Sequence, residues 1–160
     1  MSKVLTFQRD ILILGFLTLL CACLASPRVL AAEEAGRIKV TNGAVHIERE
    51  GKRIPAPVGA AVQASDVVVT GADGSVGITF HDNSLLSAGP NSELVIDKFV
   101  FDSTTHKGEF DTSLKKGTLA VVSGKIVKQS PEAMRIRTPA AIMGVRGTEF
   151  VVKVDEPVAN

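Results

Sequence analysis

The 160-residue sequence contains no tryptophan, no tyrosine and only seven phenylalanines. Carbohydrate-binding modules usually stack sugar rings on tryptophan or tyrosine, so their absence argues against a lectin-like function. Histidine is also scarce, because His46, His81 and His106 are the only three and lie far apart in the chain. The sequence therefore offers few residues for aromatic recognition or for a histidine-based metal site.

Cysteine occurs twice, as Cys21 and Cys23, and both lie within the apolar segment 11–25. If this segment is removed, no thiol is left to form a disulfide or to bind a metal ion as a thiolate. No EF-hand loop or calcium-binding nonapeptide occurs either. We therefore expect a domain that holds together without disulfides, metal ions or cofactors.

Residues 1–31 have the features of a secretory signal peptide. A basic start precedes the uncharged segment 11–25, ILILGFLTLLCACLA, and small residues follow it. An apolar stretch of about 15 residues is shorter than the roughly 20 that a spanning helix needs. We expect cleavage after Ala31 or Ala32, no membrane span afterwards, and a periplasmic or secreted location.

The same region allows an alternative. Leu20-Cys21-Ala22-Cys23 resembles a lipoprotein box, in which Cys23 would be acylated and become the mature N-terminus. A lipid anchor at Cys23, or an apolar segment that is never cleaved, would make the protein a membrane-tethered signal-transduction component.

Cleavage would leave the chain close to neutral. Without residues 1–31 it contains 15 basic and 16 acidic residues, a net charge of about −1. A nearly neutral domain has no general attraction for phosphate backbones or anionic lipid, so a nucleic-acid partner is not expected.

Short alternating patterns separated by turn residues run through the rest of the chain and predict an all-β fold. In residues 37–50, RIKVTNGAVHIERE, Ile38 and Val40 alternate with polar residues before Asn42-Gly43, and Val45 and Ile47 do so after it. This pattern predicts a β-hairpin.

Further strands are predicted at residues 66–70, 75–81, 93–101, 134–138 and 148–154, whereas residues 129–134 could form at most one helical turn. A glycine-containing turn every eight to twelve residues or so is typical of a sandwich, a barrel or an irregular solenoid. The periodicity does not choose between these closed architectures. The other predicted core residues are Val76, Ile78, Phe80, Leu94, Ile96, Phe99, Phe101, Phe110, Leu114, Leu119, Val121, Ile126, Val145 and Phe150.

Four segments carry a family resemblance. In chain order they are TNGAVHIEREGK, PVGAAVQASDVVVTGADGSVGITFHDNSLLSAGPNSEL, KKGTLAVVSGKI and IRTPAAIMGVRGTEFVV. Together they resemble the FecR-type domain, an extracytoplasmic β module, and the most specific part is Arg137-Thr138-Pro139 followed by GVRGTEF at 144–150. The resemblance implies a standalone exported FecR domain at residues 36–154, followed by a disordered tail at 155–160. It also implies a β-solenoid-like fold of short strands and tight turns, with a β-sandwich as the alternative.

In its best-known setting, the FecR-type module follows a membrane helix and relays the state of an outer-membrane siderophore receptor to a sigma factor. Here only ten residues precede the apolar segment, too few for a cytoplasmic helix bundle that binds a sigma factor. The resemblance therefore implies the module and not the sigma-regulating function.

From these features we expect a non-enzymatic module that contacts a still unidentified protein partner in the bacterial cell envelope, in envelope sensing or signalling. An exposed strand edge or a flat sheet face would be the contact surface.

The stretch GVRGTEFVV, residues 144–152, could grip an anion or form a bend. A phosphate-gripping loop needs the backbone N–H groups of a helix N-terminus. The residues that follow Gly147 favour a strand instead. We therefore expect a structural bend in which Gly144 and Gly147 adopt φ angles that other residues resist.

His81-Asp82 beside Ser84 suggests a Ser–His–Asp triad, and with it a hydrolase as the enzymatic alternative. A triad depends on spatial geometry, which one tight turn rarely provides, so we expect a hairpin tip. Four turn aspartates could hold calcium, but aspartate is common in turns because it bonds the nearby backbone. They are Asp66, Asp73, Asp82 and Asp97. No catalytic, cofactor-binding or metal-binding residue is predicted, and the ligand-binding residues are unknown.

The N-terminus of the protein purified from cells tests the predicted processing. Because signal peptidase cuts after small residues, intact-mass measurement should find a chain that starts at Ala32 or Glu33. A chain that starts at an acylated Cys23 would favour the lipoprotein, and an intact Met1 would favour the tethered form.

Overall fold

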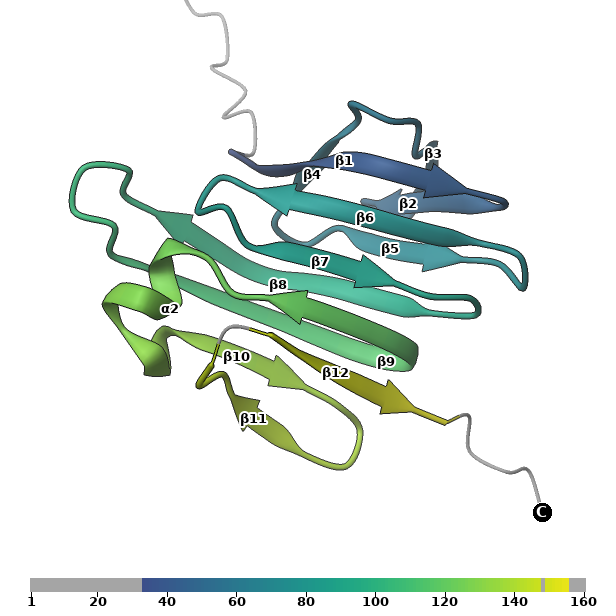
Figure 1. The fold of residues 1–160 in the computed structure, drawn as a ribbon. Coiled ribbons are helices and arrows are strands. Elements are labelled where there is room, and N and C mark those ends of the chain that lie inside the picture. The colour runs from purple at the N-terminus through teal and green to yellow at the C-terminus, as the bar shows by residue number, and fades with distance from the viewer. Residues whose placement is uncertain (1–32, 148, 156–160) are drawn as a thin grey trace, which may run out of the picture. The chain divides into compact units, whose positions relative to one another are not determined.

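Short alternating segments form 12 β-strands in one curled, mainly antiparallel sheet, as Figure 1 shows. The computed structural model describes residues 33–147 and 149–155. The predicted signal peptide at 1–31 and the tail beyond Asp155 lie outside the described residues. The strands are β1 (Glu34–Asn42), β2 (Val45–Arg49), β3 (Lys52–Pro55), β4 (Ala61–Gln63), β5 (Val67–Thr70), β6 (Ser75–Phe80), β7 (Leu85–Ala88), β8 (Glu93–Phe101), β9 (Gly108–Val122), β10 (Met134–Arg137), β11 (Ile142–Gly144) and β12 (Glu149–Val154). The predicted all-β fold is confirmed.

The sheet has two halves that share strand β9. Half A has the strand order β4-β1-β6-β7-β9-β12, and half B has the order β3-β2-β5-β8-β9-β10-β11. Residues 108–116 of β9 pair with β8 in half B, whereas residues 117–122 pair with β7 and β12 in half A. Only the β9–β10 pair is parallel among the described strands.

The chain passes between the two halves at corners that are stacked on one another. Gly71 N donates to Ala44 O (2.8 Å), Asn91 N donates to Gly71 O (3.0 Å), and Gly89 N donates to Thr118 O (2.9 Å). These bonds join four corners, at residues 42–44, 71–74, 89–92 and 116–118. Stacked corners are the solenoid-like feature of the fold, although successive runs of chain are antiparallel.

The predicted hairpin at Asn42-Gly43 is wrong in its pairing. The turn is present, but β1 pairs with β4 and β6, whereas β2 pairs with β3 and β5. A Cβ at Gly43 would lie 2.2 Å from Asp73 O, so this turn packs tightly against the next corner. The chain therefore changes halves here, and both Ile38 and Ile47 are buried in the shared core.

The predicted core is largely confirmed. Phe80 of half A and Phe99 and Phe110 of half B form a cluster with ring centroids 4.5–5.4 Å apart, which packs the two halves together. The predicted residues that are buried are Ile38, Ile47, Val76, Ile78, Phe80, Leu94, Ile96, Phe110, Leu114, Leu119, Val121, Ile126 and Val145, and those partly buried against them are Val45, Phe99, Phe101 and Phe150.

Val40 is an exception, because its side chain is 54% exposed. The register between β1 and β6 shifts between Ile38 and Val40, and this bulge turns Val40 to the outer face. A similar shift between Val95 and Lys98 in β8 explains why Phe99 and Phe101 follow a different phase from Leu94.

A short helix, α2 (Lys125–Gln129), was not predicted. Ile126 is buried as predicted, but in this helix and not in a strand. The single turn expected within 129–134 is the 3₁₀ helix η1 (Pro131–Ala133). In the part of the chain that the structure describes, no helix is long and apolar enough to span a membrane.

The corner in β9 tests how the halves are joined. Gly117 has φ 90°, and a Cβ there would lie 2.1 Å from Ser92 Oγ and 2.5 Å from Ser92 Cα. Gly59 has the same φ with no atom within 4 Å, so Gly59→Ala is a control for backbone strain alone. We expect Gly59→Ala to lower the free energy of unfolding by about 1–2 kcal/mol. Gly117→Ala should cost at least about 2 kcal/mol more in urea unfolding, because Ser92 must move. Equal losses in the two variants would contradict this view of the corner.

Candidate functional site

Within the stretch GVRGTEFVV, residues 145–147 form a bend after β11, and residues 149–152 belong to β12. Val145 is buried, and its N–H donates to Met134 O (3.0 Å). Gly147 has φ 126°, and its carbonyl accepts a hydrogen bond from Ser123 Oγ (2.7 Å). The expectation for Gly144 is wrong, because its φ is not positive. The next described element is strand β12, so the bend lacks the aligned N–H groups of a helix N-terminus.

The other part of the signature, Thr138-Pro139, also forms a turn. Thr138 N donates to Ala141 O (2.8 Å), and Ala141 N donates to Thr138 Oγ1 (3.0 Å). These bonds close the connection between β10 and β11. A hollow of about 450 Å³ beside the turn is lined by Asp97, Ser113, Leu114, Lys115, Arg137, Thr138, Pro139 and Ile142.

Asp82 and Ser84 form a buried structural contact. They lie in the β6–β7 turn, as predicted, and both are fully buried. Ser84 Oγ donates to Asp82 Oδ2 (2.7 Å) and accepts from Gly124 N (2.9 Å). Asp82 O accepts from Lys125 N (2.7 Å). The pair therefore attaches the β6–β7 turn to the start of α2, and we name it the Asp82–Ser84 latch.

His81 lies next to this latch in the sequence, but its ring has a different neighbour. Its side chain is 51% exposed, and its Nε2 lies 3.7 Å from Glu34 Oε1. No hydrogen bond joins the His81 ring to Ser84 or to Asp82 among the described contacts. The three residues are neighbours in the sequence, but they do not have the geometry of a triad.

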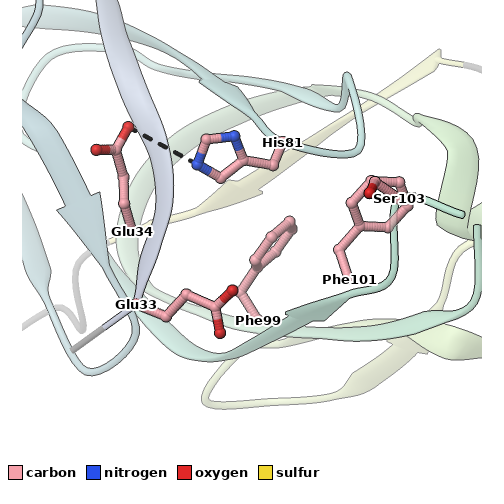
Figure 2. A pocket seen from close by; sticks show the side chains of 6 residues that line it. All are labelled: Glu33, Glu34, His81, Phe99, Phe101 and Ser103. Carbon is pink, nitrogen blue, oxygen red and sulfur yellow. Dashed lines mark ion pairs between the residues drawn. The ribbon is translucent and has the colours of Figure 1, made fainter. Parts of the chain in front are cut away.

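His81 lines a pocket of about 430 Å³, shown in Figure 2. Phe99 and Phe101 of β8 form an apolar wall, whereas Glu34 begins β1 and Glu33 directly precedes it. The full lining is Glu33, Glu34, His81, Phe99, Phe101 and Ser103. Sequence reasoning missed this pocket, because its residues come from three segments that only the tertiary fold brings together.

Glu34 is already engaged by a cation. Arg37 Nη2 donates to Glu34 Oε2 (2.8 Å), and Arg37 Nε lies 2.7 Å from Glu34 Oε1. The Oε1 atom is buried and makes no well-aligned hydrogen bond, although the ion pair is close. Because Arg37 balances the charge of Glu34, this carboxylate adds little net attraction for a charged ligand.

The four turn aspartates are separate and have protein partners. Asp66 is buried and accepts two hydrogen bonds from Arg49, each 2.7 Å, and this interaction raises the pKa of Arg49. Asp73 Oδ1 accepts from Ala44 N (3.3 Å), and Asp82 belongs to the latch. Asp97 lies within β8 and not in a turn, which corrects the prediction, and Ser113 Oγ donates to it (2.5 Å). No group of three or more metal-ligating side chains occurs within residues 33–147 and 149–155.

The three histidines are separate as well. His46 Nε2 lies 3.4 Å from Glu48 Oε1 in β2, and the ring of His106 stacks on Phe101 with centroids 6.2 Å apart.

The outer face of half B carries a network of ion pairs. Arg135 of β10 donates to both oxygens of Asp111 (2.8 and 2.9 Å) and also to Glu109. Lys98 donates to Glu109, and this hydrogen bond lowers the pKa of Glu109. The hydrogen bonds with Asp111 raise the pKa of Arg135. The charges on this face thus satisfy one another.

The outer face of half A is different, because an uncharged row crosses it. Cross-strand partners on β1, β6, β7, β9 and β12 follow one another in register. We call them the uncharged row: Val40, Gly77, Ser87, Ala120 and Val151. Val40 and Val151 are 54% and 64% exposed at its two ends, and the exposed pair Leu85 and Val122 lies beside it.

Sequence reasoning missed the uncharged row, although alternation in each strand contained part of the signal. The row positions of β6 and β7 are Gly77 and Ser87, which are small, so neither strand shows an apolar outer position there. Their alignment with Val40 depends on the β1 bulge.

Comparison with known proteins gives a family match. A family described as FecR protein matches residues 66–160, a span that contains β5 to β12 and both parts of the closing signature. No curated protein and no solved structure matches the chain.

The Asp82–Ser84 latch gives a stability prediction. Ser84→Ala removes the donor to Asp82 and the acceptor for Gly124 N, so it should cost about 1–3 kcal/mol of unfolding free energy. Ser87→Ala, on the exposed face of the adjoining strand β7, should stay within about 0.5 kcal/mol of the unaltered protein in urea unfolding, and so should His81→Ala. Equal stability of the Ser84 and Ser87 variants would show that no latch exists.

Proposed function

Because the chain belongs to the FecR protein family, we propose that it is an exported, non-enzymatic β module that acts through protein–protein contacts in the bacterial cell envelope. The FecR family is a regulatory family associated with envelope signalling. The resemblance to the FecR-type domain seen in the sequence is confirmed by the family match. In this proposal residues 1–31 direct export, residues 36–154 form the module, and an envelope protein is its partner. In the alternative, a lipid anchor at Cys23 or an uncleaved apolar segment tethers the module to a membrane.

The uncharged row on half A is the observation that carries the proposal. Interface cores are depleted of charged residues, because a charge that loses water must find a partner. Four of the seven large apolar side chains that are exposed in the described residues lie on this face: Val40, Leu85, Val122 and Val151. A flat protein surface could cover this face without burying an unpaired charge at its centre.

The contrast with half B supports the choice of face. On half B, Arg135, Asp111, Glu109 and Lys98 already pair with one another. A partner there would have to desolvate a complete ion network for little new attraction. Half A is therefore the better candidate for a stable contact.

The non-enzymatic part of the proposal has its own support. The one catalytic arrangement suggested by the sequence is used to hold the fold, since Ser84 Oγ is bonded to both Asp82 and Gly124 N. A serine held between two partners inside the protein is not placed to attack a substrate.

Photo-cross-linking in the envelope tests the contact face. A photoreactive residue in place of Ser87, at the centre of the uncharged row, should yield a covalent adduct with one envelope protein other than this chain. Leu85→Glu should reduce that adduct by at least about tenfold, because it places an unpaired charge in the interface. Val100→Glu, at an exposed position on β8, is the matched control and should leave the adduct unchanged.

Two results of the cross-linking experiment would contradict the proposal. The proposal is wrong if no adduct forms at Ser87, or if the same adducts form with the photoreactive residue at Val100.

A further inference from the structure

The four edges of the sheet differ in how well they could accept another strand. Half A ends at β4 and β12, and half B ends at β3 and β11. β4 and β11 have only three residues each, and β3 carries Lys52, Arg53 and Pro55, which discourage pairing. β12 has six residues without proline or glycine, and in the described part of the chain it pairs with β9 alone. It is therefore the longest open edge among these strands.

The hydrogen-bonding groups on the open side of β12 follow from the ladder. Alternate residues of an antiparallel strand direct their N–H and C=O groups to opposite sides. Gly89 N donates to Thr118 O on the β7 side of β9, so Leu119 and Val121 face β12.

The β12 partners of Leu119 and Val121 are Val152 and Phe150, which therefore direct their groups toward β9. This leaves the N–H and C=O groups of Glu149, Val151 and Lys153 on the open edge. These three alternate residues offer three N–H and three C=O groups, so they can form up to six backbone hydrogen bonds with an added strand.

Half B extends one strand further than half A on this side. Beyond β9, half B has β10 and β11, whereas half A has only β12. Met143 of β11 lies opposite the buried Ile136 and packs partly buried against the core. A strand added to β12 would give β11 its missing counterpart in half A.

The charges of β12 favour one partner register. Val151 is 64% exposed between Glu149 and Lys153, and all three side chains lie on the outer face of half A. Lys153 Nζ lies 2.6 Å from Asp155 Oδ1, and both groups are largely exposed. An antiparallel strand would therefore best place a basic residue opposite Glu149, an apolar residue opposite Val151 and an acidic residue opposite Lys153.

We propose that the partner of this module contributes an extended segment that pairs antiparallel with the open edge of β12. Read from its N-terminus, the segment carries an acidic residue, an apolar residue and a basic residue at alternate positions, with apolar residues between them facing β11. The proposal rests on the proposed function, because it names the chemistry of the protein partner. The added strand also extends the uncharged row, since Val151 is its last member.

The peptide TEFVVKV, which has the sequence of residues 148–154 of this chain, is a direct probe of the edge, because its order of charges is complementary to β12 when the two strands are antiparallel. The charge-exchanged peptide TKFVVEV has the same composition and would oppose like charges. Added to the natively processed full chain at low salt, TEFVVKV should bind with a dissociation constant between about 10 μM and about 1 mM. The charge-exchanged peptide should bind about tenfold more weakly.

Amide hydrogen exchange gives a readout specific to the edge. Without peptide, the N–H groups of Val151 and Lys153 should exchange quickly and that of Val152 slowly, because only Val152 is bonded to β9. TEFVVKV should slow exchange at Val151 and Lys153 by at least about tenfold and leave Val152 unchanged. No added protection at Val151 at saturating peptide would overturn the proposal.

Two variants check the register and the backbone. Glu149→Lys combined with Lys153→Glu should reverse the preference, so that TKFVVEV becomes the tighter peptide. Val151→Pro removes an N–H from the open edge only, and should abolish peptide binding while Val151→Ala retains it. If Val151→Pro does not fold, the charge exchange still decides the matter, and an unchanged preference in that variant would overturn the proposal.

These experiments distinguish three cases: a protein contact on the uncharged row, a partner strand on β12, and a second copy of the chain on β12. Adducts at Ser87 without protection of Val151 would retain a protein partner and reject strand pairing. Concentration-dependent self-association of the chain that Val151→Pro abolishes would assign the edge to a second copy and overturn the partner segment.

Discussion

The fold depends on a single strand that belongs to both halves of the sheet. β9 leaves half B at Lys116, turns at Gly117 and continues in half A. At Gly117 the backbone lies so close to Ser92 that no side chain larger than hydrogen fits. The polar groups exposed by this turn are satisfied by hydroxyls, because Thr118 N donates to Ser92 Oγ and Ser92 N donates to Thr70 Oγ1. A buried corner without these bonds would leave backbone groups unpaired. The hydroxyls therefore make the close stacking of corners possible.

This shared strand determines the character of the two outer faces. Once β9 joins the halves, inward side chains must fill one core, and the outward positions are left to interact with the surroundings. On half B those positions carry charges that pair across strands, with Arg135 against Asp111 as the central contact. On half A they are small or apolar from Val40 to Val151. The difference between a face whose charges pair with one another and a face crossed by the uncharged row is the physical basis for assigning a protein contact to half A.

The two proposals use adjoining parts of one surface. A flat partner would cover the uncharged row, whereas an extended segment would pair with β12 at its end. β12 is positioned by the GVRG bend, whose Gly147 carbonyl is bonded to Ser123 next to α2. The most distinctive motif of the chain thus places a pairing edge and does not itself form an anion-binding loop. The Asp82–Ser84 latch reaches the same region from the β6–β7 turn through Gly124.

Local patterns in the sequence predicted most of the longer strands, the buried positions of β6 and β9, the turn at Asp82-Asn83 and the bend at Gly147, but not the short strands β4, β7 and β11. They could do so because alternation and turn preference depend on neighbours only one to four residues away. They failed where the outcome depended on distant residues: Asn42-Gly43 turns the chain toward a second half and not into a hairpin, and Val40 faces outward through a bulge against β6. By itself the sequence determined an all-β module of the FecR type with short strands and glycine turns. Only the tertiary structure decided which strands pair, which face carries the uncharged row and which edge is open, because hydrogen-bond register and packing join residues far apart in the chain.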